Sequence, residues 1–459
     1  MKLMNNINPN MFRQYDIRGI FNEDLTEDVA YTIGRSYGTY IKKYNQKEVV
    51  IGHDNRVSSP LLVSALIKGI TESGSDVIDI GLVTTPMFYF AKKHLNIPTG
   101  IMVTASHNPS EYNGFKLSFE KIGNACGEEI TSFYEFTKNL VFDSGEGLVT
   151  YEDIKNSYTE EIIKSIDLGN RKLKCVIDLG NGTSSVIVKD VMSRLEIDCD
   201  ILNEKKDLTI PTEYLDPSVK TKMAYLSEVV KTGYDIGIGL DGDADRVGIV
   251  DELGHVIGAD EYMIIMARYL NKTLKNRKIL FDVKCSKALI DELTKLEIEP
   301  VMYRTGNSYV NMMMQKGDFE FGGEFSGHLF FRDKWQGFDD GLYAALRMIE
   351  ILSKTDKKMS ELLTNINKYY ATDEIKFEVN EETKFEIIKV IQDKARKENY
   401  NLVDMDGARI NFDHFWILVR ASNTGPNLTV RMEADSLDLL EIVKEKAVND
   451  LNSLIKSFK

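Results

Sequence analysis

The chain has 459 residues, of which 43% are hydrophobic and 28% are charged, and its formal net charge is −14 at pH 7. This composition is typical of a globular protein with a full core, and the negative charge disfavours nonspecific binding to nucleic acid or to an anionic membrane surface. At roughly 150 residues per domain, the length predicts three or four domains.

Neither a targeting segment nor a disulfide framework is predicted. Residues 1–16 have no apolar signal-peptide core, and no apolar run in the chain approaches the ~20 residues that span a bilayer. The four cysteines are scattered and never spaced as C-x-x-C, which favours reduced core thiols over disulfides or zinc ligands. We therefore expect a cytoplasmic protein without nucleic-acid or membrane partners.

One pattern occurs three times along the chain. A short apolar run ends in Asp and a turn, and a segment with helical apolar periodicity follows. The three runs are VVIGHDNR (49–56), CVIDLGNG (175–182) and ILFDVKCS (279–286). Strand-then-helix units predict largely parallel sheets, and the spacing of these three predicts consecutive α/β domains of similar structure.

Changes in composition predict where the domains begin and end. The segment 143–153 is polar and contains Gly, as linkers often do, and 250–261 has the pattern of two strands joined by a turn. Beyond 368–383, a Lys/Glu-rich helix at 384–398, two strand-like segments and a last helix at 436–457 predict a smaller α+β domain. The predicted domains are 1–148, 152–254, 257–367 and 371–459.

The segment TASHNPSEYNGFK (104–116) begins where a predicted strand ends. Its Ser, Asn, Pro and Gly residues favour a loop, and loops at the ends of strands in α/β sheets bind ligands. Ser106 followed by His107 suggests a nucleophile, with positive charge from Lys116. A turn whose polar side chains satisfy backbone groups is the alternative. If the loop is extended, neighbouring side chains point apart, so His107 need not be the base for Ser106.

The segment YDIGIGLDGDADRVGIVDE (234–252) predicts a metal site. A buried strand runs into Asp241, Asp243 and Asp245, and Arg246 follows. Three carboxylates so close together repel one another unless a cation lies among them, and oxygen ligands favour Mg²⁺ or Ca²⁺. A solvated acidic turn is the alternative, but apolar runs on both sides place the cluster at the end of a sheet.

The segment GGEFSGH (322–328) combines a carboxylate, a hydroxyl and an imidazole with little bulk. Polar side chains on a tight loop are suited to recognising sugar hydroxyls, although an ordinary turn has the same composition.

The segment RASNTGPNLTVR (420–431) has the composition of a phosphate site. Two arginines flank hydroxyls, an amide and Gly425. Arg binds phosphate through two hydrogen bonds, and loop N–H groups add further donors. The chain contains no GK[ST] motif of a nucleotide-binding loop, so a monophosphate is favoured over ATP.

These four segments, in this order, resemble those of the α-D-phosphohexomutase family, especially its bacterial phosphomannomutase/phosphoglucomutase branch. The likeness extends from YDIRG (15–19) to RASNTGPNLTVRMEA (420–434). TASHNP resembles the family's phosphoserine loop, DGDADR its magnesium loop, GEFSGH its sugar-specificity loop and RASNTGP its phosphate-binding loop. The resemblance implies an α/β fold of three similar domains with mixed, largely parallel sheets and a smaller C-terminal α+β domain, arranged around a central cleft.

The resemblance also implies an activity, the interconversion of hexose 1-phosphate and hexose 6-phosphate of mannose, glucose or both. Phosphorylated Ser106 would give its phosphoryl group to the substrate, and the resulting hexose 1,6-bisphosphate would turn over in the cleft and return its other phosphate. One Mg²⁺ per chain and catalytic hexose 1,6-bisphosphate as activator are implied. The expected partner is the hexose phosphate, and the expected assembly is a monomer or homodimer.

Roles for individual residues follow from the same resemblance. Catalytic roles are implied for Ser106, Arg18, Lys116 and Arg246, and metal binding for Ser106, Asp241, Asp243 and Asp245. Substrate binding is implied for Tyr15, His107, Lys284, Asn307, Glu324, Ser326 and His328. Phosphate binding is implied for Arg420, Ser422, Asn423, Thr424 and Arg431.

Two positions depart from the pattern of this branch. Asn307 in RTGNSYV (304–310) stands where a His is common, and Asn cannot exchange protons near neutral pH. Phe325 stands where Met is frequent, whereas the sugar-recognising Glu324 and Ser326 are retained. GFDDGLY (337–343) is a further stretch shared with the branch.

Three alternative functions remain open on the sequence. Phosphoglucosamine mutase is the nearest, although its sugar loop typically has Gln at the position of Phe325. A metal-dependent sugar phosphatase with a Ser nucleophile would normally need a second site rich in His and Asp, and the chain has only six histidines. A noncatalytic sugar-phosphate sensor would keep the phosphate loop at 420–431 but need not keep the three aspartates.

Overall fold

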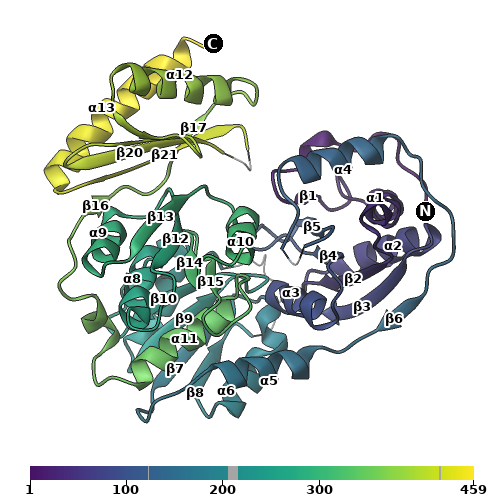
Figure 1. Ribbon diagram of the computed structural model, residues 1–459, viewed down its shortest axis with the longest axis horizontal. Coiled ribbons are helices and arrows are strands. Elements are labelled where there is room, and N and C mark those ends of the chain that lie inside the picture. Colours follow the sequence, from purple (N-terminus) through teal and green to yellow (C-terminus); the bar gives the residue numbers. More distant parts are fainter. Residues whose placement is uncertain (122, 205–214, 423–424, 459) are drawn as a thin grey trace.

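The computed structural model describes residues 1–121, 123–204, 215–422 and 425–458. In Figure 1 the chain forms four regions in sequence order, which we name domains I to IV. Domain I lies at the right of the view, domains II and III pack together below, and domain IV lies at the upper left.

Domain I contains a six-stranded sheet in the order β1-β5-β4-β2-β3-β6. Its elements are β1 (Ile17–Ile20), α1 (Glu27–Tyr40), β2 (Glu48–His53), α2 (Ser59–Glu72), β3 (Asp76–Leu82), α3 (Thr85–His94), β4 (Gly100–Val103), β5 (Tyr112–Ser118), α4 (Glu128–Lys138) and β6 (Val149–Tyr151). The predicted boundary at residue 148 falls just before β6, which pairs with β3. All three residues of β6 are exposed, so no apolar alternation marks this edge strand in the sequence.

Domains II and III have sheets in the orders β11-β10-β9-β7-β8 and β13-β12-β14-β15. Domain II consists of α5 (Lys155–Ser165), β7 (Lys174–Asp178), α6 (Val188–Arg194), β8 (Asp198–Leu202), α7 (Ala224–Val230), β9 (Ile236–Leu240), β10 (Val247–Asp251) and β11 (Val256–Ile257). Domain III consists of α8 (Ala259–Leu270), β12 (Lys278–Asp282), α9 (Lys287–Lys295), β13 (Glu299–Tyr303), α10 (Asn307–Gln315), β14 (Phe321–Gly323), β15 (Leu329–Phe331) and α11 (Gly341–Ser353). Short 3₁₀ turns lie at Pro9–Met11, Ile41–Tyr44, Thr183–Val186, Lys220–Met223 and Met359–Leu363.

These three sheets repeat one arrangement of four strands, β5-β4-β2-β3 in domain I, β10-β9-β7-β8 in domain II and β15-β14-β12-β13 in domain III. Of these four strands, the one that comes first along the chain is central: β2, β7 or β12. The next two along the chain run parallel to it, one on either side. The fourth strand is antiparallel to the third. The prediction of three similar α/β domains with mixed sheets is confirmed.

The pattern that occurs three times in the sequence marks the central strand of each sheet. β2, β7 and β12 are each followed, or ended, by an aspartate: Asp54, Asp178 and Asp282. A carboxylate oxygen of each accepts the backbone N–H two residues further on, at 3.0, 2.8 and 3.1 Å respectively. This side-chain-to-backbone bond closes the turn after the strand, which is why Asp recurs at this position.

Domain IV is a smaller α+β unit, as predicted, whose sheet is antiparallel. Its elements are β16 (Tyr370–Ala371), β17 (Ile375–Glu378), α12 (Thr383–Lys397), β18 (Asn401–Val403), β19 (Ala408–Asn411), β20 (Phe415–Ala421), β21 (Asn427–Ala434) and α13 (Leu437–Lys456). Side chains alternate along β20, so that Val419 packs in the core with α12 and α13 while Trp416 and Leu418 pack against Val283 of domain III.

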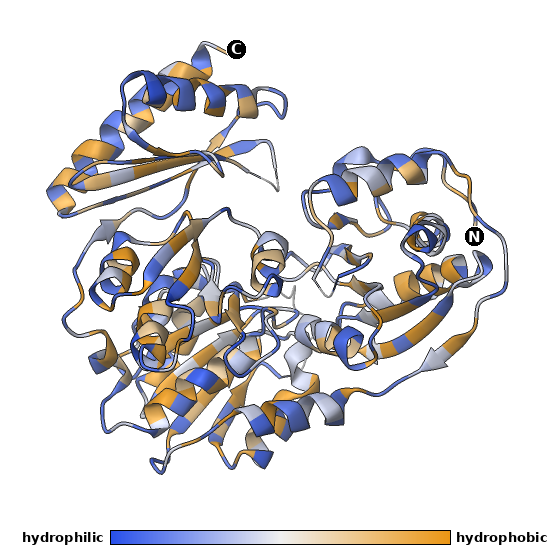
Figure 2. Ribbon diagram, viewed as in Figure 1, coloured by the Kyte–Doolittle hydropathy of each residue, from blue (hydrophilic) through white to orange (hydrophobic). Residues whose placement is uncertain are grey.

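The largest core cluster connects domains I to III, and contains Phe88 of α3, Ile177 of β7 and Phe281 of β12. In Figure 2 the sheet strands are mainly orange, and the helices around them carry blue residues. Because the three domains share buried apolar surface, the ends of their sheets are held in fixed positions around a common centre. Within the described parts of the chain, no helix has the length and apolar character needed to cross a membrane.

Candidate active site

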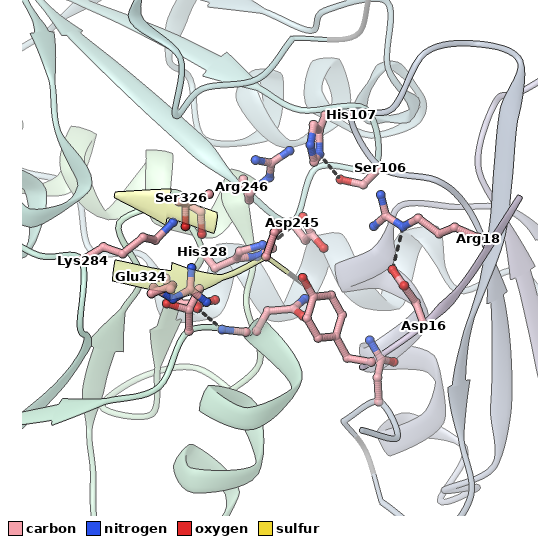
Figure 3. A pocket seen from close by; sticks show the side chains of 18 of the residues that line it. Asp16, Arg18, Ser106, His107, Asp245, Arg246, Lys284, Glu324, Ser326 and His328 are labelled. Atoms are coloured by element: carbon pink, nitrogen blue, oxygen red, sulfur yellow. Dashed lines mark hydrogen bonds and ion pairs between the residues drawn. The ribbon is translucent and has the colours of Figure 1, made fainter. Parts of the chain in front are cut away.

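The same loop of each of domains I to III contributes to one cavity. These loops join β4 to β5, β9 to β10 and β14 to β15, and they comprise residues 104–111, 241–246 and 324–328. They open onto a cavity of about 230 Å³ that residues of all four domains line. Figure 3 shows the side chains that converge there. The predicted nucleophile, acidic and sugar loops are therefore structurally equivalent.

The structure brings most of the predicted site residues to this cavity. Its lining includes Tyr15, Arg18, Ser106, His107, Lys116, Asp245, Arg246, Lys284, Asn307, Glu324, Ser326, His328, Arg420 and Ser422. Asp241 and Asp243 lie directly behind the lining, in contact with Ser106 and Lys116 respectively. Asn423 and Thr424, predicted to bind phosphate, lie outside the described residues. No role was predicted for the lining residues Asp16, Asn124, Thr305, Gly306, Glu374, Lys376 and Thr429.

Ser106 lies in a strained turn next to the acidic cluster. Its φ angle is 52°, in the left-handed region that residues with a Cβ seldom adopt, and its backbone N–H donates to Thr104 Oγ1 at 3.0 Å. Ser106 Oγ donates to Asp241 Oδ2 at 2.9 Å and lies 3.2 Å from His107 Nδ1. Extended backbone would separate the side chains of Ser106 and His107, and the left-handed turn is the reason that they meet.

Arg56 holds this loop in place, a role that was not predicted from the sequence. The side chain is buried, its Nε contacts Asp54 at 3.0 Å, and it donates to the carbonyls of Ser106 and Asn108 at 2.8 and 2.7 Å. It also donates to two further carbonyls of the loop, those of Pro109 and Tyr112. In the sequence this role is marked only by an Arg two residues after an Asp that follows a strand. That signal is weak because the groups that accept from Arg56 are backbone carbonyls some fifty residues away.

The three aspartates form a buried cluster, as their spacing predicts. Asp241, Asp243 and Asp245 are each fully buried, with carboxylate oxygens within 4.8 Å of one another. Lys116 from domain I lies 2.8 Å from Asp243 Oδ2 and 2.6 Å from Asp245 Oδ2, and Arg246 Nε lies 2.9 Å from Asp241 Oδ2. Although burial opposes ionisation, the Lys116 ammonium lowers the pKa of Asp243 below its usual value.

The cluster has free oxygen atoms suited to a cation. Asp243 Oδ1 and Asp245 Oδ1 are buried and have no hydrogen-bond partner among the described residues. A buried carboxylate oxygen without a partner costs free energy, which a bound cation would offset. The side chains therefore suit a hard divalent metal ion, because they offer carboxylate oxygens and two of these oxygens lack a hydrogen-bond partner among the described residues.

The sugar loop places Glu324 where a sugar hydroxyl can reach it. Glu324 Oε1 accepts from the Gly306 N–H at 2.6 Å, and Oε2 is buried with no partner among the described residues. Gly306 has a φ of 128°, which a residue with a Cβ rarely adopts. Burial raises the pKa of Glu324 to about 7.

Asn307 and His328 share one buried carboxylate, that of Asp339. Asn307 Nδ2 donates to Asp339 Oδ2 at 3.0 Å, and His328 Nδ1 lies 2.7 Å from the same oxygen. Burial lowers the pKa of His328, but Asp245 and Asp339 outweigh it and raise the pKa to about 9. The residue that departs from the family pattern is thus connected to the imidazole of the sugar loop through Asp339 of GFDDGLY.

Domain IV contributes Glu374, Lys376, Arg420, Ser422 and Thr429 to the cavity. Arg420 is buried and pairs with Asp406 Oδ2 at 2.8 Å, and the same oxygen accepts the Thr305 N–H of domain III at 2.9 Å.

Arg431, predicted to bind phosphate, lies elsewhere. It stacks on Phe325 at 3.8 Å and donates to the Lys284 carbonyl. Arg431 is not one of the described residues that line the cavity. In strand β21 it comes two residues after Thr429, one step further along the same face of the sheet.

Basic side chains gather in the cavity despite the acidic composition of the chain. Burial and the Arg246 guanidinium lower the pKa of His107 well below its usual value, so its imidazole is neutral near pH 7. The lining contains the cations Arg18, Lys116, Arg246, Lys284, Lys376 and Arg420, against the carboxylates Asp16, Asp245, Glu324 and Glu374. A site of this kind attracts an anionic ligand.

Four family models match consecutive parts of the chain. They are described as the alpha/beta/alpha domains I, II and III of phosphoglucomutase/phosphomannomutase and the C-terminal domain of the same proteins. The matches cover residues 9–141, 156–254, 258–370 and 374–449 respectively.

Relatives and solved structures match over nearly the whole chain. A phosphomannomutase/phosphoglucomutase of Pseudomonas syringae is 37% identical over 95% of this chain and 93% of its own. A phosphoglucomutase of Neisseria meningitidis is 35% identical over 98% of both chains. A solved structure from Burkholderia thailandensis, described as a phosphoglucomutase/phosphomannomutase family protein, has a TM-score of 0.89 and 31% identity over 98% of both chains.

Proposed function

Because the chain belongs to the phosphoglucomutase/phosphomannomutase family, we propose that it interconverts hexose 1-phosphate and hexose 6-phosphate, with glucose and mannose as the sugars. Its relatives are isomerases, and on this proposal the enzyme acts through phosphorylation of Ser106. The observation that carries this proposal is that Ser106 Oγ lies 2.9 Å from the buried acidic cluster, at a cavity that all four domains line.

The reaction that this site supports consists of two phosphoryl transfers. A free sugar hydroxyl attacks the phosphorus on Ser106, the bond from phosphorus to Oγ breaks, and hexose 1,6-bisphosphate forms. The proton lost by the hydroxyl is balanced by one that Oγ gains. The bisphosphate then turns over in the cavity, and Oγ attacks its other phosphate, which restores phosphoserine and leaves the isomeric monophosphate. Catalytic hexose 1,6-bisphosphate therefore serves to phosphorylate inactive enzyme.

Lys116, Arg246 and Arg18 stabilise the charge that develops during transfer. All three line the cavity beside Ser106, and Arg18 Nη1 donates to Asn108 Oδ1 of the same loop at 2.6 Å. Phosphoryl transfer depends mainly on positioning and on such electrostatic stabilisation. His107 Nδ1, 3.2 Å from Oγ, helps to orient the serine.

Members of the family are metal-dependent, and we assign one Mg²⁺ to the acidic cluster. Asp241, Asp243 and Asp245, with an oxygen of phosphorylated Ser106, would hold it, because two of the carboxylates keep oxygens without a hydrogen-bond partner among the described residues. The ion supplies positive charge that offsets the charge on the transferring phosphoryl group.

We assign the sugar and the nonreacting phosphate to the parts of the cavity that domains III and IV line. Glu324 and Ser326 recognise sugar hydroxyls, and Arg420 and Ser422 bind the phosphate that does not react. Two phosphate-binding ends with a polyol-binding centre suit a substrate that must bind in both orientations. Tyr15, Lys284, Asn307 and His328 also line the cavity.

A panel of hexose 1-phosphates, each with a trace of 1,6-bisphosphate, tests the proposed function. We expect glucose and mannose phosphates to be isomerised within ~1000-fold of each other in kcat/KM, since neither Glu324 nor Ser326 need contact the C2 hydroxyl. Net release of inorganic phosphate would instead indicate a phosphatase. Turnover of glucosamine phosphate alone would indicate the phosphoglucosamine enzyme, and binding without turnover would indicate a sensor.

A phosphatase is disfavoured by the geometry of the histidine in the sugar loop. Asp245, His328 and Asp339 are a second group of possible metal ligands among the described residues. However, this group shares Asp245 with the acidic cluster, and its His328 Nδ1 is paired with Asp339 Oδ2 at 2.7 Å, which favours one metal site over the two that a phosphatase would need.

Arg420→Ala should mainly raise KM, by roughly ten-fold to a hundred-fold, because the contact with the nonreacting phosphate is made equally in the ground and transition states. Steady-state kinetics with glucose 1-phosphate measure this. The matched control is Arg396→Ala on α12, whose side chain is half exposed. An unchanged KM in Arg420→Ala would mean that this arginine only pairs with Asp406.

Glu324→Gln should stabilise the fold above neutral pH. Because burial raises the pKa of Glu324 to about 7, above its unfolded value of 4.5, ionisation of this carboxyl costs stability as pH rises between these values. The gain from Gln should therefore be small at pH 4.5 and reach the order of 3 kcal/mol above pH 7. Thermal unfolding at pH 5 and pH 8 measures it, with exposed Glu299→Gln as control. An equal shift in melting temperature at both pH values would show that ionisation of Glu324 is not the cause.

A further inference from the structure

Domain IV contacts domain III through the face of its sheet that is opposite α12 and α13. On this face the strand register places Arg409 beside Leu418, and Leu418 beside Arg431. Arg420 and Thr429, which line the cavity, form the neighbouring pair. Arg420, which is assigned to the nonreacting phosphate, and the two further arginines therefore belong to one hydrogen-bonded sheet.

Arg409 and Arg431 bind three consecutive carbonyl groups of domain III. Arg409 Nη1 donates to the carbonyl of Val283 at 2.7 Å and to that of Cys285 at 2.9 Å. Arg431 Nη1 donates to the carbonyl between them, that of Lys284. The two arginines thus fix the backbone of the loop that follows β12.

The environment of Arg409 is costly for a cation. Its side chain is 1% exposed, it stacks on Trp416 at 4.0 Å, and its Nε donates to Asn411 Oδ1 at 3.1 Å, but it forms no ion pair with any described residue. Burial lowers its pKa to about 10. An apolar side chain would fill this space without the cost of removing a charge from water. What the guanidinium provides in return is a pair of charge-assisted hydrogen bonds to one loop.

That loop carries Lys284 into the cavity, where Figure 3 shows its side chain near Glu324 and Ser326. Its ammonium lies 3.8 Å from Glu374 Oε1 and 5.4 Å from the centre of the Phe325 ring. The Lys284 N–H is held within domain III, by Asp282. The carbonyls of the loop are held from domain IV, so both domains determine where the ammonium lies.

We propose that Arg409 is a positioning residue of the mutase, which sets the ammonium of Lys284 in the cavity by binding the carbonyls on either side of it. This inference rests on the proposed function. Since Arg409 and Arg420 belong to one sheet, the domain that binds the nonreacting phosphate also places Lys284 against the substrate. Domain IV therefore acts on the substrate at two points, directly through Arg420 and indirectly through Lys284.

A double-mutant cycle with Arg409→Met and Lys284→Met tests the proposal. Met packs against Trp416 but cannot donate, so Arg409→Met should lower kcat/KM by about ten-fold to a hundred-fold, mainly through KM. In the Lys284→Met background the same change should have less than about a two-fold effect, because the side chain that it positions is gone. Losses that multiply in the double variant would overturn the proposal. Arg409→Lys, which can donate to one carbonyl, should recover part of the activity.

Amide hydrogen exchange provides a readout that does not depend on activity. In Arg409→Met, exchange in the peptide that contains residues 283–286 should be faster than in the unmodified enzyme, and in Arg409→Lys it should be intermediate. Exchange in Arg396→Met, a control on the outer helix, should not change. Unchanged exchange in Arg409→Met would overturn the positioning role even if the mutase reaction is established. Absence of mutase activity in the unmodified enzyme would refute the function and leave the exchange result to stand.

Discussion

Ser106→Ala is expected to abolish nearly all turnover, with a loss in kcat of about 10⁴-fold or more, as when a nucleophile is removed from other enzymes. Oγ is the atom that carries the phosphoryl group. His107 Nδ1 lies 3.2 Å from Oγ and not at its position, so we expect that the imidazole does not take over this role. The loop should keep its shape, since Arg56 holds it through backbone carbonyls that the substitution leaves intact. Binding of hexose phosphate, measured by calorimetry, should be retained.

Mass spectrometry distinguishes this expectation from a merely structural role. The enzyme with the native Ser106 should carry an increment of ~80 Da on the peptide that contains this residue, and the Ser106→Ala variant should not. Dephosphorylated enzyme should be inactive with hexose monophosphate alone and should recover with catalytic 1,6-bisphosphate. Ser110→Ala, an exposed serine of the same loop, is the matched control. A Ser106→Ala enzyme with substantial activity would mean that the phosphoryl group travels by another route.

Asp243→Asn should lower kcat by roughly 10³-fold, through loss of a charged metal ligand and of the partner of Lys116. The side chain is fully buried, with Oδ2 bound to Lys116 and Thr85 and Oδ1 without a partner among the described residues. An amide can still accept from Thr85, so the fold should persist. It cannot neutralise the ammonium or hold Mg²⁺ as tightly, and excess Mg²⁺ should restore only part of the activity.

Magnesium titration followed by calorimetry measures the second consequence directly. Apparent affinity should fall in Asp243→Asn and stay unchanged in Asp198→Asn, an exposed aspartate of the same domain. Chelation should abolish turnover by the unmodified enzyme. Full activity of Asp243→Asn, or turnover that survives chelation, would remove the metal from the mechanism.

Interactions within a few residues of the chain were readable from the sequence. The Asp that closes the turn after β2, β7 and β12 bonds to a backbone group two residues away, so the repeat of the α/β unit is visible in a local pattern. The three aspartates lie within five residues of one another, and their crowding indicates a cation wherever the loop lies. Asn307 could be recognised as a departure from the family pattern because the motif around it, RTGNSYV, is one continuous stretch of the sequence.

Other parts of the site depend on packing between distant segments, and only the tertiary structure decided them. Ser106 reaches His107 because a left-handed φ turns the loop, and Arg56 and Asp339 act through contacts with residues far away in the chain. From the sequence, Arg431 was predicted to bind phosphate, and no role was predicted for Arg409. The sheet register turns both toward domain III, where a buried guanidinium finds carbonyl acceptors that no local pattern specifies.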